Sequence, residues 1–159
     1  FPRGVLPLSS VVAAGLDAVI AFGLQLVLMV MVGESLKPTL LLWPLLMLLA
    51  ASISLGVGLF LAPAVVRFRD LRYAIPLTLQ LLLLASPVGY PLSAVPHELR
   101  SWYQLNPFAG LMESFRTIAL QGKVPAATAL APAMGWAVVL VVLGALYFRS
   151  QEATVADYV

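Results

Sequence analysis

Four long stretches without charged side chains constrain this sequence more than any other feature. One runs from Val5 to Val32 and is interrupted only by Asp17, and three unbroken ones follow: Thr39–Val66, Tyr73–Pro96 and Val124–Phe148. Each is long enough for a helix that rises about 1.5 Å per residue to cross about 30 Å of hydrocarbon. The chain is 62% hydrophobic and only 10% charged, whereas soluble domains are about a quarter charged. A soluble fold would therefore expose large apolar patches, which a bilayer accommodates.

The stretches indicate helices, because a membrane strand must alternate apolar and polar residues within a closed barrel. Runs such as Leu40–Leu42 and Leu81–Leu84 do not alternate. We therefore expect an all-α integral membrane protein that forms a single transmembrane domain over residues 1–159. The prediction is about four transmembrane helices, with a re-entrant external helical hairpin before the last span. Their expected positions are about 8–32, 40–66, 74–91 and 126–148 for the spans and 92–123 for the hairpin.

The densest charge cluster orients the chain in the membrane. Arg67, Arg69 and Arg72 lie within six residues, together with Asp70. The positive-inside rule places this loop in the cytoplasm, and Gly33–Pro38 and the hairpin on the outside. Both ends of the chain then fall on the cytoplasmic side.

The hairpin has clear helix signals in its second half. Asn106 is a favourable N-cap, Pro107 suits the first helical position, and Gly122 suits the C-terminal stop. Glu113 and Arg116 are three residues apart and can pair on one side of the helix. An apolar face is expected at Phe108, Leu111, Met112, Phe115, Ile118 and Ala119. A further short helix is expected at 96–105.

Several kinds of chemistry are not supported by the sequence. Cysteine is absent and His97 is the only histidine, so no multi-histidine or thiolate metal site is expected. No glycine-rich phosphate loop with Lys and Ser/Thr is present, so ATP is not expected to bind to this chain. We expect no catalytic residue, and no basic run suggests nucleic acid.

The order of several short motifs resembles a known family. They comprise Arg69-Asp70-Leu71-Arg72, then Ser86-Pro87-Val88-Gly89-Tyr90-Pro91-Leu92, then Val95-Pro96, then Leu105-Asn106-Pro107-Phe108-Ala109-Gly110-Leu111-Met112-Glu113-Ser114-Phe115-Arg116. This order resembles the permeases of type 2 ABC exporters, and most closely the branch that exports lipid-linked polysaccharides such as O-antigen, capsule and teichoic acid precursors. The likeness covers nearly the whole chain. The opening Phe1-Pro2-Arg3 is similar to the end of that family's cytoplasmic coupling region.

The resemblance implies a six-span subunit of the bacterial inner membrane, of which this chain would supply the C-terminal part. It implies a homodimer of permeases with two copies of an ATPase that holds ATP and Mg, and no cofactor in this chain. Residues implied at the ATPase-coupling loops are Phe1, Pro2, Arg3, Arg67, Arg69, Asp70 and Arg72. Residues implied at the external gate or substrate path are Tyr90, Trp102, Tyr103, Asn106, Pro107, Phe108, Glu113 and Arg116.

Several of these residues also have simpler interpretations. Asp17 is either an ion or substrate contact or, more simply, the buried partner of an Arg near the cytoplasmic interface. The arginine cluster serves either ATPase docking or topology and lipid phosphates. The aromatic residues either stack on sugars or form an interfacial belt, which we favour. The small residues Ser52, Ser54, Gly56 and Gly58 are interpreted as a helix-packing stripe.

The sequence therefore favours a permease subunit that moves a lipid-linked glycan, driven by ATP hydrolysis on partner subunits. Two alternatives stay open. One is an exporter of drugs or lipids with the same fold, and the other is a membrane anchor or assembly subunit that does not transport. An intramembrane enzyme is disfavoured, because Asp17 is the only acidic residue within a predicted span.

Overall fold

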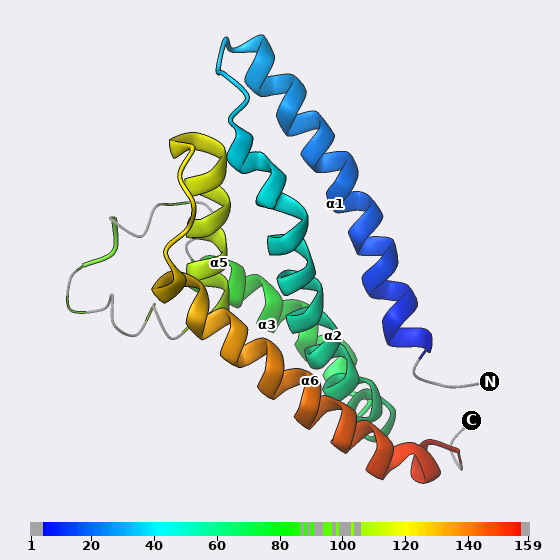
Figure 1. Ribbon diagram of the computed structural model, residues 1–159. Helices are drawn as coiled ribbons and strands as arrows, with labels where there is room; N and C mark the ends of the chain where they lie inside the picture. The colour runs from blue at the N-terminus through cyan, green and yellow to red at the C-terminus, as the bar shows by residue number, and fades with distance from the viewer. Residues whose placement is uncertain are drawn as a thin grey trace.

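The computed structural model describes residues 5–86, 88, 90, 94–96, 98, 103 and 106–156, and all regular structure among them is helical (Figure 1). This confirms the all-α membrane fold. The elements are α1 (Val5–Met31), a 3-10 turn η1 (Pro38–Leu42), α2 (Trp43–Arg67), α3 (Leu71–Ala85), α5 (Pro107–Arg116), a π-helical turn η3 (Thr117–Gln121) and α6 (Ala127–Ala156).

Three of the described helices are long and apolar enough to cross a membrane. They are Leu8–Met31, Pro38–Arg67 and Ala127–Gln151, and they coincide closely with three predicted spans. The fourth predicted span, at 74–91, corresponds to the shorter helix α3. Its 15 residues rise about 22 Å, less than the ~30 Å hydrocarbon core. A fourth crossing at this place therefore stays a prediction.

The early end of α3 has a local cause. Ser86, the residue after the helix, has extended backbone angles (φ −98°, ψ 143°). Pro87 follows it in the sequence, and a proline disfavours the helical conformation in the residue before it. The helix therefore ends at Ala85, about six residues before the end that the apolar pattern predicted.

The apolar core lies where α2, α5 and α6 meet. One cluster joins Leu46, Leu111 and Ile118, and a second joins Ile53, Ala133 and Ala137. Ile53, Leu111 and Ile118 are completely buried in the chain alone. These three helices therefore form one packed unit, which we call the α2–α5–α6 body.

Glycines allow the helices of this body to approach closely. A Cβ atom on Gly56 of α2 would lie 2.6 Å from the backbone carbon of Leu140 on α6. A Cβ atom on Gly110 of α5 would lie 1.9 Å from the carbonyl oxygen of Ala129. Only a residue without a side chain fits at such crossings, as is common where membrane helices pack.

The expected stripe of small residues on α2 divides between two faces. Gly56 meets α6, whereas Ser54 and Gly58 line a groove toward α1. Positions two apart on a helix differ by about 200° in direction, so 56 cannot share a face with 54 and 58. The prediction of close packing is confirmed for Gly56, and a single stripe is wrong.

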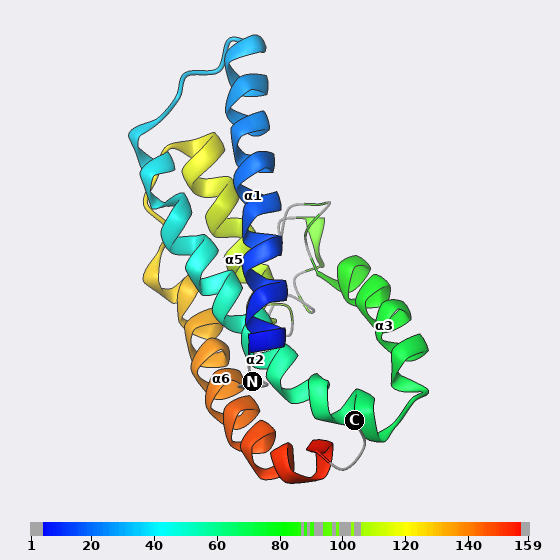
Figure 2. The same ribbon diagram turned by 90° about the vertical axis from the view of Figure 1, so that its right-hand side faces the viewer.

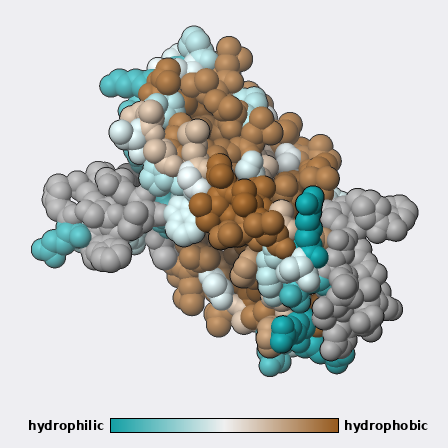
Figure 3. All heavy atoms as spheres, turned by 60° about the horizontal axis from the view of Figure 1, so that its bottom comes forward, coloured by the Kyte–Doolittle hydropathy of each residue, from teal (hydrophilic) through white to brown (hydrophobic). Residues whose placement is uncertain are grey.

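Helices α1 and α3 have much less contact with the body. Helix α1 runs beside α2 and meets it through a stacked pair, Phe22 and Trp43, with ring centroids 4.1 Å apart. Figure 2 shows α3 to one side of the other helices, and every residue from 76 to 84 is exposed. Many large apolar side chains of α1, α3 and α6 are exposed, and Figure 3 shows hydrophobic side chains over much of the molecule's face. A bilayer is the solvent that such a surface requires.

Candidate functional site

The charged loop between α2 and α3 presents its side chains to solvent. Arg67, Arg69, Asp70 and Arg72 are all exposed, and none of them has an ion pair with another described residue. Backbone hydrogen bonds hold the turn, including Leu71 N to the Phe68 oxygen at 3.1 Å. The loop is therefore an ordered turn whose charges are free to meet lipid phosphates or another protein.

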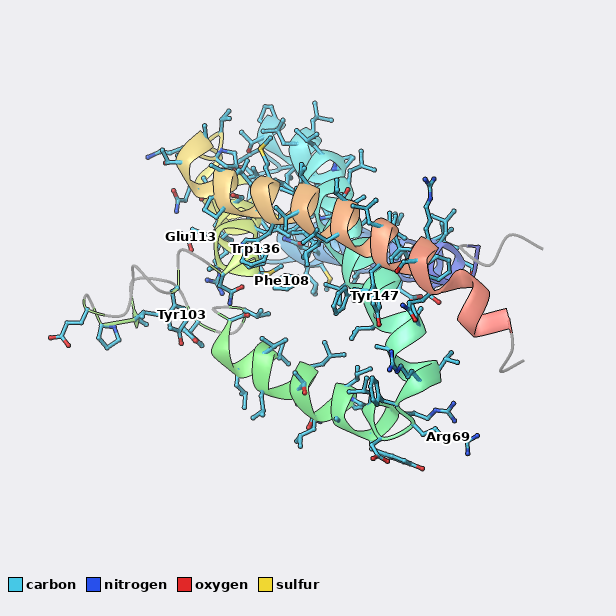
Figure 4. All side chains as sticks on the ribbon, turned by 90° about the horizontal axis from the view of Figure 1, so that it is seen from below. Arg69, Tyr103, Phe108, Glu113, Trp136 and Tyr147 are labelled. Atoms are coloured by element: carbon cyan, nitrogen blue, oxygen red, sulfur yellow. The ribbon has the colours of Figure 1, made fainter. Side chains whose placement is uncertain are left out.

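The predicted cytoplasmic and external segments lie at opposite ends of the molecule. Helices α2 and α6 run in the same direction, so the loop after α2 and the C-terminal end of α6 share one end, which we call the arginine end (Figure 1). The turn after α1 and the end of the hairpin share the other, which we call the hairpin end. Figure 4 shows Arg69 far from Tyr103 and Glu113. Which of the two ends faces the cytoplasm stays a prediction.

Helix α5 begins as its sequence predicts, and the predicted stop at Gly122 comes after the η3 turn that follows it. The Asn106 side chain accepts a hydrogen bond from Phe108 N at 3.0 Å, and Pro107 occupies the first turn. Gly122 has left-handed backbone angles (φ 65°, ψ 28°) that suit glycine. Between them lies an unpredicted π-turn, in which Gly122 N bonds to the Thr117 oxygen.

A polar cluster joins α5 to the segment that follows α3. We call it the Arg116 cluster. The Arg116 guanidinium donates two hydrogen bonds of 2.7 Å, one to the Tyr90 carbonyl and one to the Val88 carbonyl. Asn106 Nδ2 donates to the buried Ser86 hydroxyl at 3.0 Å. Two separate points of α5 are thus tied to the end of α3.

The predicted pair of Glu113 and Arg116 is present, with Oε2 and Nη1 3.8 Å apart. Glu113 Oε2 is buried and accepts no hydrogen bond from a described residue. The guanidinium is therefore its one close positive neighbour in the described part of the chain. The arginine serves two carbonyls and one carboxylate at once, for which its planar fork of donors is suited.

Two tyrosines of the predicted substrate path lie together. The hydroxyls of Tyr90 and Tyr103 are 3.1 Å apart, and Tyr90 also donates to the Leu84 carbonyl at 3.1 Å. Tyr90 therefore acts as a hydrogen-bonding group that links Tyr103 to the end of α3.

The η3 turn is fastened to the η1 turn that precedes α2. Lys37 Nζ donates to the Leu120 carbonyl, and Thr39 Oγ1 donates to the Ile118 carbonyl at 2.7 Å. Both carbonyls belong to the last turn of a helix, where acceptors lack an intrahelical donor. The sequence did not indicate these two bonds, because their partners are about 80 residues apart.

Asp17 is exposed on α1, and no described residue forms an ion pair with it. The expected partner arginine is therefore not found within the described residues. Nearby, α1 and α2 enclose a groove of about 520 Å³, lined mostly by small side chains. Its lining includes Ser10, Ala14, Gly15, Ala51, Ser54 and Gly58.

Other predicted residues are placed differently or lie outside the described part. Phe108 is half-buried against Ile53, Ala133 and Ala137, so it belongs to the apolar core and not to the tyrosine pair. Phe1, Pro2, Arg3 and Trp102, with most of the expected 96–105 helix, lie outside the described residues. Among the residues that the structure describes, no three His, Asp or Glu side chains gather as metal ligands would.

The structure defines a multi-pass α-helical membrane protein in which the short helix α5 and the η3 turn precede the last long helix. The family model described as "ABC-2 type transporter" matches residues 3–120, and the chain belongs to this family. Family membership and the three membrane-length helices make it a multi-pass protein of the bacterial inner membrane.

Curated relatives match most of this chain. It is 33% identical to an O-antigen export system permease protein, RfbA, from Myxococcus xanthus, over 99% of this chain and 61% of the relative. An RfbA of the same description from Klebsiella pneumoniae is 27% identical over 77% of the chain and 48% of the relative. The polysialic acid transport protein KpsM of Escherichia coli is 26% identical over 94% of the chain and 60% of the relative. The chain thus spans about half to three fifths of the length of these relatives.

Proposed function

We propose that this chain is the C-terminal membrane portion of a permease subunit that exports a lipid-linked polysaccharide across the bacterial inner membrane. The observation that carries the proposal is the 33% identity to an O-antigen export permease over almost the whole chain. A second relative is named for transport of a different polysaccharide, which supports the substrate class and leaves the particular glycan open.

The proposed assembly contains two permease copies and two copies of an ATPase subunit, with ATP and Mg on the ATPase. The exposed Arg67–Arg72 loop supports an ATPase contact at the arginine end, because its charges are unpaired among the described residues. The hairpin is the proposed external gate, with Tyr90, Tyr103, Asn106, Glu113 and Arg116 beside the path. Alternation between two packed states, each stabilised by a ligand on the partner, would move the substrate.

Reconstitution of the full-length permease with its ATPase in proteoliposomes tests this function. We expect ATP-dependent movement of a lipid-linked glycan, and co-purification of the two subunits. Export that proceeds without ATP, or a permease that binds no ATPase, would contradict the proposal. Transport of drugs or simple lipids in place of glycan would favour the first alternative. Stimulated ATPase turnover without any transport would favour the assembly subunit.

Cysteine labelling tests the orientation separately, because this chain has no cysteine of its own. We expect Arg69→Cys to react with a membrane-impermeant maleimide only from the cytoplasmic side, and Glu34→Cys only from the outside. Labelling of both from one side would contradict the predicted topology.

A further inference from the structure

Helix α3 is held in place by its two ends. Its residues from 76 to 84 are all exposed, and its packing against the other helices is slight. At one end the short turn through Arg69 connects it to α2. At the other end the Arg116 cluster connects it to α5.

The position of the two carbonyls that accept from Arg116 explains why this side chain matters to them. They belong to Val88 and Tyr90, just beyond the last turn of α3, where the helix supplies no further amide donors. A carbonyl without a donor there costs free energy, so a side chain that donates to both stabilises this segment. Lysine could reach one carbonyl, whereas the arginine fork serves both and still faces Glu113.

We propose that Arg116 is a positioning residue that makes α3 a strut between the arginine end and the hairpin. Asn106 and Ser86 form a pivot at the start of α5, and Arg116 fixes the second point, about three helical turns further along. With both points fixed, α3 cannot swing relative to α5. A displacement of the Arg67–Arg72 loop then reaches the hairpin through α3, by a route separate from α2 and α6.

The anchoring is tested without ATP by spin-label distances in the full-length permease. One label pair, at Leu81 on α3 and Gln121 at the end of the hairpin, reports the strut, and both positions are exposed. A second pair, at the exposed Leu48 of α2 and Val138 of α6, reports the body. We expect Arg116→Gln to broaden the first distance distribution and to leave the second unchanged. Arg116→Lys should also broaden the first, and Glu113→Gln should keep it narrow because the two carbonyl bonds remain.

Two outcomes overturn the anchoring. If the Leu81–Gln121 distribution stays as narrow in Arg116→Gln as in the wild type, α3 is positioned by something else. If the Leu48–Val138 distribution broadens as well, Arg116 supports the whole fold and does not position α3 in particular.

The transmission of movement rests on the proposed export function, whereas the anchoring does not. In proteoliposomes with the ATPase, we expect Arg116→Gln to lower glycan export while ATP hydrolysis continues. Equal loss of export and hydrolysis, or unchanged export, would overturn transmission through the strut. A wild type that exports no glycan would contradict the proposed function and would leave the distance result standing.

Discussion

The α2–α5–α6 body and the helix α3 are held in place by different kinds of interaction. In the body, glycines at 56 and 110 bring backbones into contact, and small and branched side chains fill the interface. Helix α3 has no such interface and is tied by hydrogen bonds at its ends. Close packing gives a rigid unit, whereas end attachment gives an element whose position depends on a few side chains.

The comparison has a physical basis in the membrane. Lipid tails are as apolar as leucine, so burial of leucine gives little association between helices. Close van der Waals contact and satisfied polar groups remain as the forces that join them. Close van der Waals contact mainly holds the body together, and hydrogen bonds between polar groups mainly hold α3. Substitutions that remove one of them should therefore affect the two regions differently.

The largest effect is expected from Gly110→Ala, which would break the body. The new Cβ atom would lie 1.9 Å from the Ala129 carbonyl oxygen, a backbone atom that cannot rotate away. Overpacking costs about 1–3 kcal/mol, occasionally more, and we expect the upper end because two helices must separate. Thermal unfolding of the permease in detergent measures it. Gly135→Ala on α6 is the matched control, since nothing lies within 4 Å of its Cβ position. A Gly110→Ala variant that unfolds at the wild-type temperature would contradict the close approach of Gly110 to Ala129.

Shortening the Ile53 side chain leaves a cavity, and this tests how much packing stabilises the α2–α5–α6 body. Ile53 of α2 is fully buried against α6, and Ile53→Ala should cost about 2 kcal/mol, the lower end for such a substitution, because lipid is as apolar as the side chain that is removed. Leu48→Ala, an exposed position on the same helix, should have little effect. Equilibrium unfolding in denaturant compares the two. Equal losses would mean that lipid contact, and not packing, stabilises α2.

The Asn106 side chain makes two bonds, the cap of α5 and the link to Ser86, and substitutions can distinguish their effects. Asn106→Ala removes both, and loss of an N-cap costs about 0.5–2 kcal/mol. Ser86→Ala keeps the Asn106 oxygen that accepts from Phe108 N and removes the hydroxyl that accepts from Asn106 Nδ2. We expect the Ser86→Ala variant to unfold near the wild-type temperature while α3 becomes more mobile in hydrogen exchange. Equal unfolding temperatures for both variants would show that the cap contributes little.

The smallest effect on stability is expected at Asp17. Its side chain is exposed and has no ion pair within the described part of the chain, so Asp17→Asn should change unfolding by less than about 0.5 kcal/mol. Unfolding of this chain in detergent is the measurement. A loss well above that value would indicate a partner that stabilises the folded chain.

Much of the secondary structure was predictable from local signals. Three spans agree closely with the uncharged runs, because helix length and bilayer thickness limit them directly. Asn106, Pro107 and Gly122 marked the ends of the hairpin helix and its turn through their own conformational preferences. The end of α3 was misplaced because the apolar pattern continues past Ser86, although Pro87 was a usable signal.

The sequence by itself determined that this chain is helical and lies in a membrane, since charge and hydropathy act on each segment independently. It also identified Arg116 and its partner Glu113, because they are neighbours on one helix. Only the tertiary structure decided that Arg116 binds the carbonyls beyond α3, that Lys37 and Thr39 hold the hairpin end, and that Gly56 meets α6 while Gly58 does not. Every residue has a backbone carbonyl, so the sequence does not show which one accepts a hydrogen bond from a distant side chain. The face that a helix turns to its neighbours depends on helices distant in the chain.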